Sequence, residues 1–257
     1  MIKGVFLDID GTMVSFQAHH VPDNTKKALQ EVRNNGIKLF VATGRHSSDI
    51  IHLGDLEFDG YITLNGAICR VGDEVIFKKS IPQEDIASFI RYDEEIEPIP
   101  CFFVEEDKVS INREDELITQ MMEMVQFSPR QLIPSRAFLD KEIFQLTAFF
   151  PVEREAELLN HFPGCELSRW YPTFADLVAR GVDKSIGLEK IGACFGFGAG
   201  EMMAIGDGGN DISMLRYAGT GVAMENANEE VKRAADYITT SVENDGIGNA
   251  LRHFGLI

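Results

Sequence analysis

Short apolar runs alternate with amphipathic stretches along the first third of the chain. Residues 5–7 form the first apolar run, and a helix is expected to begin near Pro22 and to end at Gly36. Two further runs, at 38–42 and 61–64, predict two more buried strands. Strand, helix and strand in this order are typical of βαβ units, so we expect a parallel sheet.

The same rhythm returns near the end of the chain, after Gly181. It predicts a helix over about 184–194, a strand over 202–205, and short strands over 221–223 and 237–239. The two ends of the chain are therefore expected to build one domain. Its fold class is α/β, with a doubly wound, Rossmann-like parallel sheet.

The middle of the chain has an α+β pattern, in which helical stretches alternate with separate apolar segments. The helices are expected near 83–95, 114–127 and 153–161, and the apolar segments lie at 101–104, 109–111 and 146–150. This pattern predicts an inserted α+β cap domain over residues 82–181. Residues 1–81 and 182–257 would then form the catalytic core, with hinges near Ser80–Pro82 and Arg180–Val182.

The net charge and the cysteines indicate which binding partners and which cellular compartment to expect. The chain has 257 residues and a formal net charge of −17, which disfavours nucleic acids and anionic membranes as partners. The four cysteines are scattered without a CxxC pair, which favours reduced thiols. With neither a secretory signal nor a membrane-length apolar run, we expect a cytoplasmic protein that acts on a small molecule. The sequence leaves the oligomeric state open, and a monomer is compatible with it.

Four polar residues directly follow predicted strands: Asp8, Thr43, Asn65 and Asp207. Ligands of a doubly wound sheet bind in the crevice at the carboxyl ends of its strands. We therefore expect these four side chains to face a common site.

Two acidic segments supply the oxygen ligands of a possible metal site. Asp8 and Asp10 are two residues apart and precede Gly11, and residues 206–211 combine three glycines with Asp207 and Asp211. Taken alone, each segment could be only a turn. Together they form an oxygen-only donor set, which suits Mg²⁺.

Two further positions could bind an anion. Thr43 offers a hydroxyl and, with Gly44, backbone N–H groups at the expected start of a helix, a geometry that suits a phosphate oxygen. Lys184, at the start of a later helix, could supply a fixed positive charge, although a lone lysine in this position is usually solvated. Arg45 lies beside the phosphate loop and is a candidate contact for the substrate's leaving group.

These residues resemble the four ordered motifs of the haloacid dehalogenase (HAD) superfamily. The segments that carry the resemblance are Asp8-Ile9-Asp10-Gly11-Thr12, Ala42-Thr43-Gly44-Arg45, Lys184 and Gly206-Asp207-Gly208-Gly209-Asn210-Asp211. Leu64-Asn65-Gly66-Ala67 and the place of the insert resemble the Cof-type branch. Members of that branch are mostly sugar-phosphate phosphatases with a large cap. One departure is Ser185, where relatives often have glycine.

The resemblance implies a Mg²⁺-dependent phosphatase that forms an aspartyl-phosphate on Asp8. Asp10 would act as general acid and base, and its presence favours phosphoryl transfer over dehalogenation, because an alkoxide leaving group needs a proton. The binding roles implied are metal ligation by Asp8, the Asp10 carbonyl and Asp207 with support from Asp211, and phosphate or substrate binding by Thr43, Gly44, Arg45, Asn65, Lys184 and Asn210.

Two alternatives to the phosphatase stay open. The same core could serve a phosphomutase or phosphotransferase, in which a second hydroxyl accepts the phosphoryl group. A receiver-like phospho-switch also combines acids, a threonine and a lysine, but it would be about half this length. In the cap, Arg169 beside Trp170 could contact the substrate or could belong to a strand edge.

Overall fold

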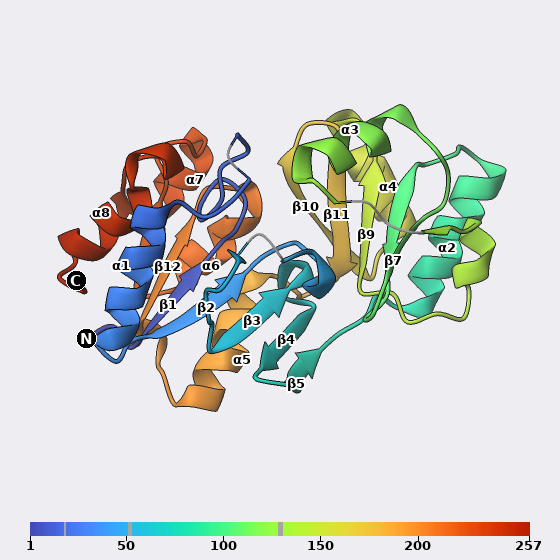
Figure 1. Ribbon diagram of the computed structural model, residues 1–257. Helices are drawn as coiled ribbons and strands as arrows, with labels where there is room; N and C mark the ends of the chain where they lie inside the picture. Colours follow the sequence, from blue (N-terminus) through green and yellow to red (C-terminus); the bar gives the residue numbers. More distant parts are fainter. Residues whose placement is uncertain (18, 51–52, 128–130) are drawn as a thin grey trace. The chain divides into compact units, whose positions relative to one another are not determined.

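The computed structural model describes residues 1–17, 19–50, 53–127 and 131–257 (Figure 1). The chain divides into two compact units. The first, here called the core unit, contains Met1–Arg45, Ile50–Lys78 and Asp183–Ile257. The second, the cap unit, contains His46–Asp49 and Lys79–Val182.

The core unit is built on an eight-stranded sheet with the order β14-β13-β12-β1-β2-β3-β4-β5. From β14 to β3 neighbouring strands run parallel, and β4 and β5 are added antiparallel at one edge. The strands are β1 (Gly4–Leu7), β2 (Lys38–Ala42), β3 (Gly60–Thr63), β4 (Ile68–Val71), β5 (Glu74–Lys78), β12 (Met202–Gly206), β13 (Thr220–Ala223) and β14 (Tyr237–Ile238). Because β1 lies between β2 and β12, the chain order reverses at β1, and this is the position where such sheets bind ligands.

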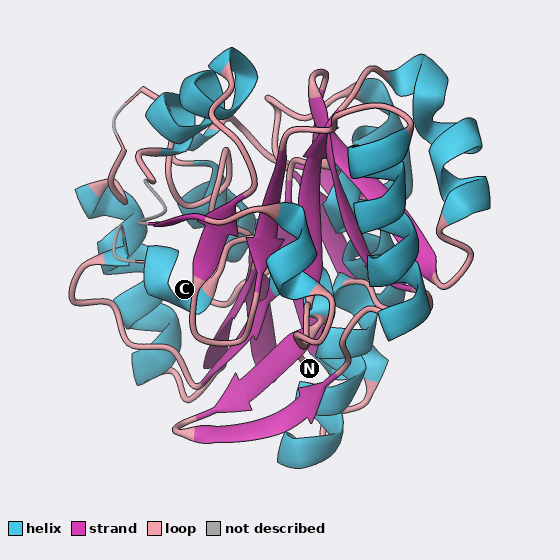
Figure 2. Cartoon of the chain, turned by 90° about the vertical axis from the view of Figure 1, so that its right-hand side faces the viewer, coloured by secondary structure: helices cyan, strands magenta, loops and turns pink. Residues whose placement is uncertain are grey.

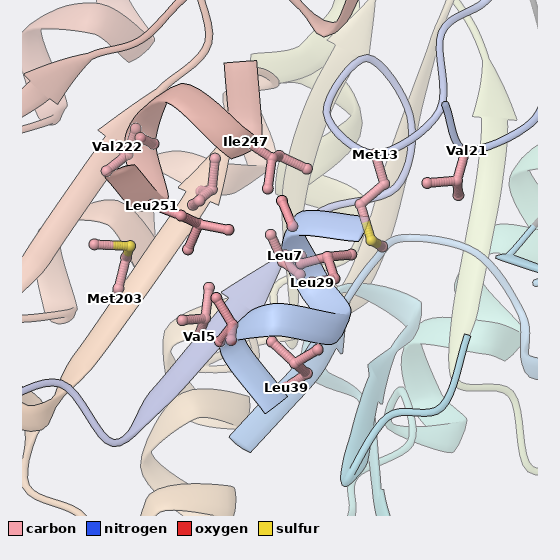
Figure 3. Packing of buried hydrophobic residues seen from close by; sticks show 14 of the residues in the cluster. Val5, Leu7, Met13, Val21, Leu29, Leu39, Met203, Val222, Ile247 and Leu251 are labelled. Carbon is pink, nitrogen blue, oxygen red and sulfur yellow. The ribbon is translucent and has the colours of Figure 1, made fainter. Parts of the chain in front are cut away.

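Helices cover both faces of the core sheet because its strands are apolar on both sides. On one face, Val5 and Leu7 of β1 pack with Leu29 and Leu251 from two helices (Figure 3). On the other face, Phe6 packs in a cluster with residues of three helices. The helices are α1 (Asp23–Asn34) and α8 (Gly246–His253) on the first face, and α5 (Lys184–Phe195), α6 (Ile212–Tyr217) and α7 (Glu229–Ala234) on the second.

The cap unit has a separate six-stranded sheet with the order β10-β11-β9-β6-β7-β8. Its strands are β6 (Cys101–Val104), β7 (Val109–Ile111), β8 (Gln131–Leu132), β9 (Gln145–Phe149), β10 (Cys165–Tyr171) and β11 (Phe174–Ala179), and its helices are α2 (Gln83–Glu95), α3 (Glu116–Val125) and α4 (Glu155–His161). Phe89 of α2 and Phe162, directly after α4, pack in one cluster with Phe103 and Leu146 of the sheet. The helices and strands of the chain are distinguished by colour in Figure 2.

The predicted α/β class with a second sheet is confirmed, and the predicted strands are present to within two residues at each end. Several elements were not predicted, among them β8, β10 and β11 and the helices α6, α7 and α8. The β4–β5 hairpin was not predicted, because residues 68–78 mix charged and apolar side chains without a clear alternation. The helix expected at Thr43-Gly44 is wrong: no helix begins there, and a 3₁₀ turn follows at Ser47–Asp49. Among the described residues, no helix has both the length and the apolarity needed to cross a membrane.

Candidate active site

Three adjacent strands end in the polar residues that the sequence analysis singled out. Leu7 of β1 is in register with Ile205 of β12 and with Val41 of β2. Asp8 follows β1, and Asp207 follows β12 one residue later. The parallel register therefore brings these acids together at the carboxyl edge of the sheet.

Lys184 lies between two carboxylates. Its Nζ donates to Asp8 Oδ1 and to Asp211 Oδ1, each at 2.6 Å, and its side chain is fully buried. Burial lowers the pKa of Lys184, but the charges of Asp211 and Asp8 outweigh it and raise the pKa above the ordinary value. Lys184 therefore stays protonated. Because it is buried between two acids, it is not the solvated lysine that is usual at the start of a helix.

The serine at position 185 is accommodated by the hydrogen bonds of Asp183 at the start of α5. Asp183 caps α5, since its side chain accepts a hydrogen bond from Ile186 N at 3.1 Å. Ser185 Oγ donates to the same Asp183 oxygen. The departure from glycine is thus accommodated by an additional bond to the capping residue.

Asp8 and Asp207 are buried beside another acid, and the positive charge near them does not offset the cost of ionising them there. Burial, followed by the charge of Asp211, raises the pKa of Asp8 well above its ordinary value, and Lys184 offsets this only in part. Burial and the charge of Asp211 also raise the pKa of Asp207 to about 7. Carboxylate oxygens of Asp8, Asp207 and Asp211 lie within 4.8 Å of one another. A divalent cation with oxygen ligands fits this set, because it would neutralise the excess charge.

We expect the Mg²⁺ affinity of this site to rise with pH up to about 7, the pKa of Asp207. An acid whose pKa is raised in the folded protein binds a proton there that the unfolded chain lacks. Without metal, Asp207 therefore destabilises the fold progressively as pH rises from about 4 toward 7. Mg²⁺ must displace this proton, which by itself should lower the affinity about tenfold per pH unit below 7.

Calorimetric titration of Mg²⁺ across this pH range measures the affinity. The Thr12 hydroxyl donates to Asp207 Oδ1 at 2.7 Å and lowers the pKa of Asp207. Thr12→Val should consequently move the midpoint to higher pH. An affinity independent of pH in the wild type would contradict the prediction.

The turn that carries Asp207 is held by Asp211. Asp211 Oδ2 accepts hydrogen bonds from the backbone N–H groups of Asp207 and Gly208, each at 2.9 Å. A Cβ on Gly206 would come within 2.5 Å of the Asp211 carboxyl carbon, so only glycine leaves space for this contact. The glycine-rich segment is therefore more than a turn. Its glycines leave space for the buried Asp211 carboxylate, which accepts hydrogen bonds from the backbone of the same loop.

The loops after β2 and β3 form one hydrogen-bonded unit. Thr43 is buried, its backbone carbonyl accepts from Asn65 N at 3.0 Å, and its Oγ1 accepts from Arg45 N at 3.1 Å. Asn65 Oδ1 in turn accepts from Asn210 Nδ2 at 2.9 Å, which joins this unit to the loop after β12. A Cβ on Gly44 would be 3.2 Å from the Asn65 amide. Thr43, Gly44, Asn65 and Asn210 are thus brought together, as expected of one binding site.

The segment after β3 has an unusual backbone. Leu64, Asn65 and Gly66 have φ values of 51°, 54° and 100°. The left-handed region is unfavourable for a residue such as Leu64, and strain of this kind concentrates at functional sites. A Cβ on Gly66 would be 2.1 Å from Asp183 O, so glycine is required where this segment contacts the loop before Lys184.

Arg45 contacts the predicted general acid. Its Nε donates to Asp10 Oδ2 at 2.8 Å and its Nη2 donates to Asp10 Oδ1 at 2.7 Å. Both side chains are largely buried, and a bidentate pair of this kind fixes the plane of the carboxylate. The sequence analysis placed Arg45 near the phosphate loop but did not foresee this partner, because positions 10 and 45 are linked only through the fold.

Asn226 was missed by the sequence analysis. It lies three residues beyond the end of β13, and its Nδ2 donates to Gly11 O at 2.9 Å and to Asp207 Oδ2 at 3.2 Å. Its signal was the one used for Asp8 and Asp207, a polar residue beyond a strand end. The three-residue offset made that signal weak.

Arg169 has structural partners inside the cap unit. Its guanidinium pairs with Glu155 and donates to the carbonyl oxygens of Phe150, Pro172 and Phe174. The cation also lies 5.1 Å from the centre of the Phe150 ring. These contacts favour the strand-edge alternative over a contact with substrate.

The fold and site thus define an α/β protein in which a buried lysine and three acids are grouped at the carboxyl edge of a doubly wound sheet. A family model described as haloacid dehalogenase-like hydrolase matches residues 5–251. YkrA of Bacillus subtilis (strain 168), which is named as a phosphatase, is 32% identical over 259 residues, covering 99% of this chain and 98% of YkrA.

Solved structures extend this likeness to the fold. The HAD subclass IIB sugar phosphatase BT4131 matches with a TM-score of 0.95 and 44% identity, over 99% of this chain and 100% of that one. BT1666 of Bacteroides thetaiotaomicron, a HAD phosphatase, matches with a TM-score of 0.92 and 38% identity, over 100% and 96% of the two chains. The chain belongs to the haloacid dehalogenase-like hydrolase family and is a phosphatase of its Cof-type subclass IIB. The resemblance inferred from the motifs is confirmed.

Proposed function

We propose that this protein hydrolyses small phosphate monoesters, sugar phosphates above all, through an aspartyl-phosphate on Asp8. The observation that carries the proposal is the buried contact of Lys184 with Asp8 and Asp211 beside Asp207. An anionic nucleophile can approach an anionic phosphate only where positive charge is fixed nearby. The sugar-phosphate class is supported by the 44% identity to a structure described as a sugar phosphatase.

In this mechanism an oxygen of Asp8 attacks phosphorus, and the bond to the leaving oxygen breaks. Lys184 stays protonated and stabilises the charge on the transferring group. Thr43, the Gly44 backbone and Asn210 bind the phosphoryl oxygens. The Thr43 hydroxyl can donate to such an oxygen, because its contact with Arg45 N uses only an acceptor lone pair.

Asp10 transfers the protons. It donates one to the leaving oxygen and later removes one from the water that hydrolyses the aspartyl-phosphate. Arg45 holds both oxygens of this carboxylate and so fixes its direction. We assign Arg45 first to positioning Asp10, and a contact with the substrate remains a second possible role.

Mg²⁺ is the cofactor implied by the donor set and by the family. Asp8, the Asp10 carbonyl and Asp207 would hold it, and Asp211 would support its water molecules. When bound, it supplies charge neutralisation between the nucleophile and the phosphate. Residues 82–181 would serve as the cap that excludes water during the reaction, with hinges near Ser80–Pro82 and Arg180–Val182.

The experiment that tests the proposal measures phosphate release from para-nitrophenyl phosphate and a panel of sugar phosphates, with Mg²⁺ or with EDTA. Repeated turnover that is lost in EDTA supports a Mg²⁺-dependent phosphatase. Transfer to an added sugar would instead support the phosphotransferase alternative, and a single release without turnover would support the phospho-switch. No release from any ester while Mg²⁺ is bound would overturn the proposal.

We expect Arg45→Met to slow the hydrolysis of sugar phosphates about 100-fold while para-nitrophenyl phosphate is affected much less. A sugar alkoxide needs the proton from Asp10, whereas nitrophenolate leaves without it. The measurement compares kcat and KM for both esters. Arg33→Met is a suitable control, because Arg33 contacts Glu57 in the same unit and not an acid of the site. A rise in KM for sugar phosphates with unchanged kcat would instead assign Arg45 to substrate binding.

A further inference from the structure

The orientation of the Asn226 side chain is determined by its backbone partners. Val242 N–H can only donate, and it lies 3.3 Å from Asn226 Oδ1. The amide oxygen therefore faces Val242, and the NH₂ group faces the opposite side. There it reaches two acceptors, Gly11 O at 2.9 Å and Asp207 Oδ2 at 3.2 Å.

Asp207 consequently receives a donor on each carboxylate oxygen. Thr12 Oγ1 donates to Oδ1 at 2.7 Å, and Asn226 Nδ2 donates to Oδ2. The first donor comes from the loop after β1 and the second from the loop after β13. Two donors on opposite oxygens fix the rotation of the carboxylate, and each oxygen keeps a lone pair that can bind a cation.

The Asn226 amide also lies where the first loop contacts Asp207. Gly11 has a φ of 79°, and a Cβ there would come within 2.2 Å of Asp207 Oδ2. The Asp10 carbonyl is a proposed metal ligand. The backbone next to it is therefore in close contact with the Asp207 carboxylate. Asn226 donates hydrogen bonds to both partners of this contact, the Gly11 carbonyl and the Asp207 carboxylate.

We propose that Asn226 is a positioning residue, which holds the Asp10–Gly11 backbone and the Asp207 carboxylate in the arrangement that binds the metal. The inference rests on the proposed function for the identity of the ligands. It adds the loop between β13 and α7, which carries no ligand itself, as a determinant of metal affinity. Residues that orient metal ligands typically contribute 10- to 100-fold to affinity.

The test measures Mn²⁺ binding through the electron paramagnetic resonance signal of the free ion, with purified full-length protein. Asn226→Ala removes both hydrogen-bonding groups, and Asn226→Leu removes them while keeping a side chain with the same branching. Both variants should raise the Mn²⁺ dissociation constant about tenfold. In turnover, the Mg²⁺ concentration for half-maximal rate should rise while kcat at saturating Mg²⁺ changes less.

Asn228 provides the matched control. It lies in the same loop and caps α7, accepting from Glu230 N and Val231 N at 3.0 Å each. Asn228→Ala should lower the melting temperature by about 3 °C and leave Mn²⁺ binding unchanged. Wild-type Mn²⁺ affinity in both Asn226 variants would overturn the positioning role, whatever their stability. Absence of Mn²⁺ binding in the wild type would overturn the metal site itself, whereas binding without turnover would overturn only the phosphatase.

Discussion

Replacing Asp8 with asparagine is expected to reduce turnover of every phosphate ester by at least about 10⁴-fold. Asparagine has nearly the same shape but cannot attack phosphorus to form the acyl-phosphate. Because the loss removes a chemical step and not a contact with one substrate, para-nitrophenyl phosphate and sugar phosphates should be affected alike. Steady-state phosphate release measures the effect.

The same substitution should leave the protein folded. Burial and the charge of Asp211 raise the pKa of Asp8, so its ionised form is disfavoured in the folded state. A neutral side chain removes this cost, and we expect the melting temperature in EDTA to be no lower than that of the wild type. Asp23→Asn, on the exposed first turn of α1, is the control and should keep full activity. Substantial turnover by Asp8→Asn would exclude Asp8 as the nucleophile.

Lys184→Met is expected to reduce both activity and stability. Activity should fall about 10³-fold, because the variant lacks the fixed charge beside the transferring phosphoryl group. Removing one partner of a buried ion pair leaves an uncompensated charge, which costs about 3–5 kcal/mol. Here two carboxylates, Asp8 and Asp211, lose the same cation. Chemical denaturation in EDTA measures the loss, which should shrink as pH falls and Asp8 takes up a proton, because the pKa of Asp8 is raised well above its ordinary value.

Two further variants make this result specific. Lys190 lies on the same helix and forms an exposed pair with Glu189. The free energy of unfolding of the Lys190→Met variant should differ from that of the wild type by less than about 0.5 kcal/mol. The double variant Lys184→Met with Asp211→Asn should recover part of the stability, because it removes one of the two unpaired charges. It should not recover activity. Equal stability of Lys184→Met and the wild type would show that the buried contact contributes nothing to the fold.

The periodicity and the order of the motifs were sufficient to predict the α/β class. Apolar runs at β1, β2 and β12 are unmistakable, since strands buried on both faces need continuous apolar sequence. Polar residues at the ends of those strands predicted that Asp8, Thr43 and Asp207 would meet, because parallel neighbours end at the same edge of the sheet. This part of the site follows from local sequence and one topological rule.

The side-chain partnerships were decided by the tertiary structure. Nothing near Arg45 in the sequence indicates that it pairs with Asp10, and the weak strand-end signal of Asn226 does not identify Asp207 as its partner. Such contacts depend on how loops from separate strands bend, and those bends depend on close approaches such as Gly66 against Asp183. Long-range register, loop conformation and burial together determine them, and a one-dimensional pattern contains none of the three. The sequence therefore specifies which groups carry the chemistry, while the packing of the loops specifies which group orients which.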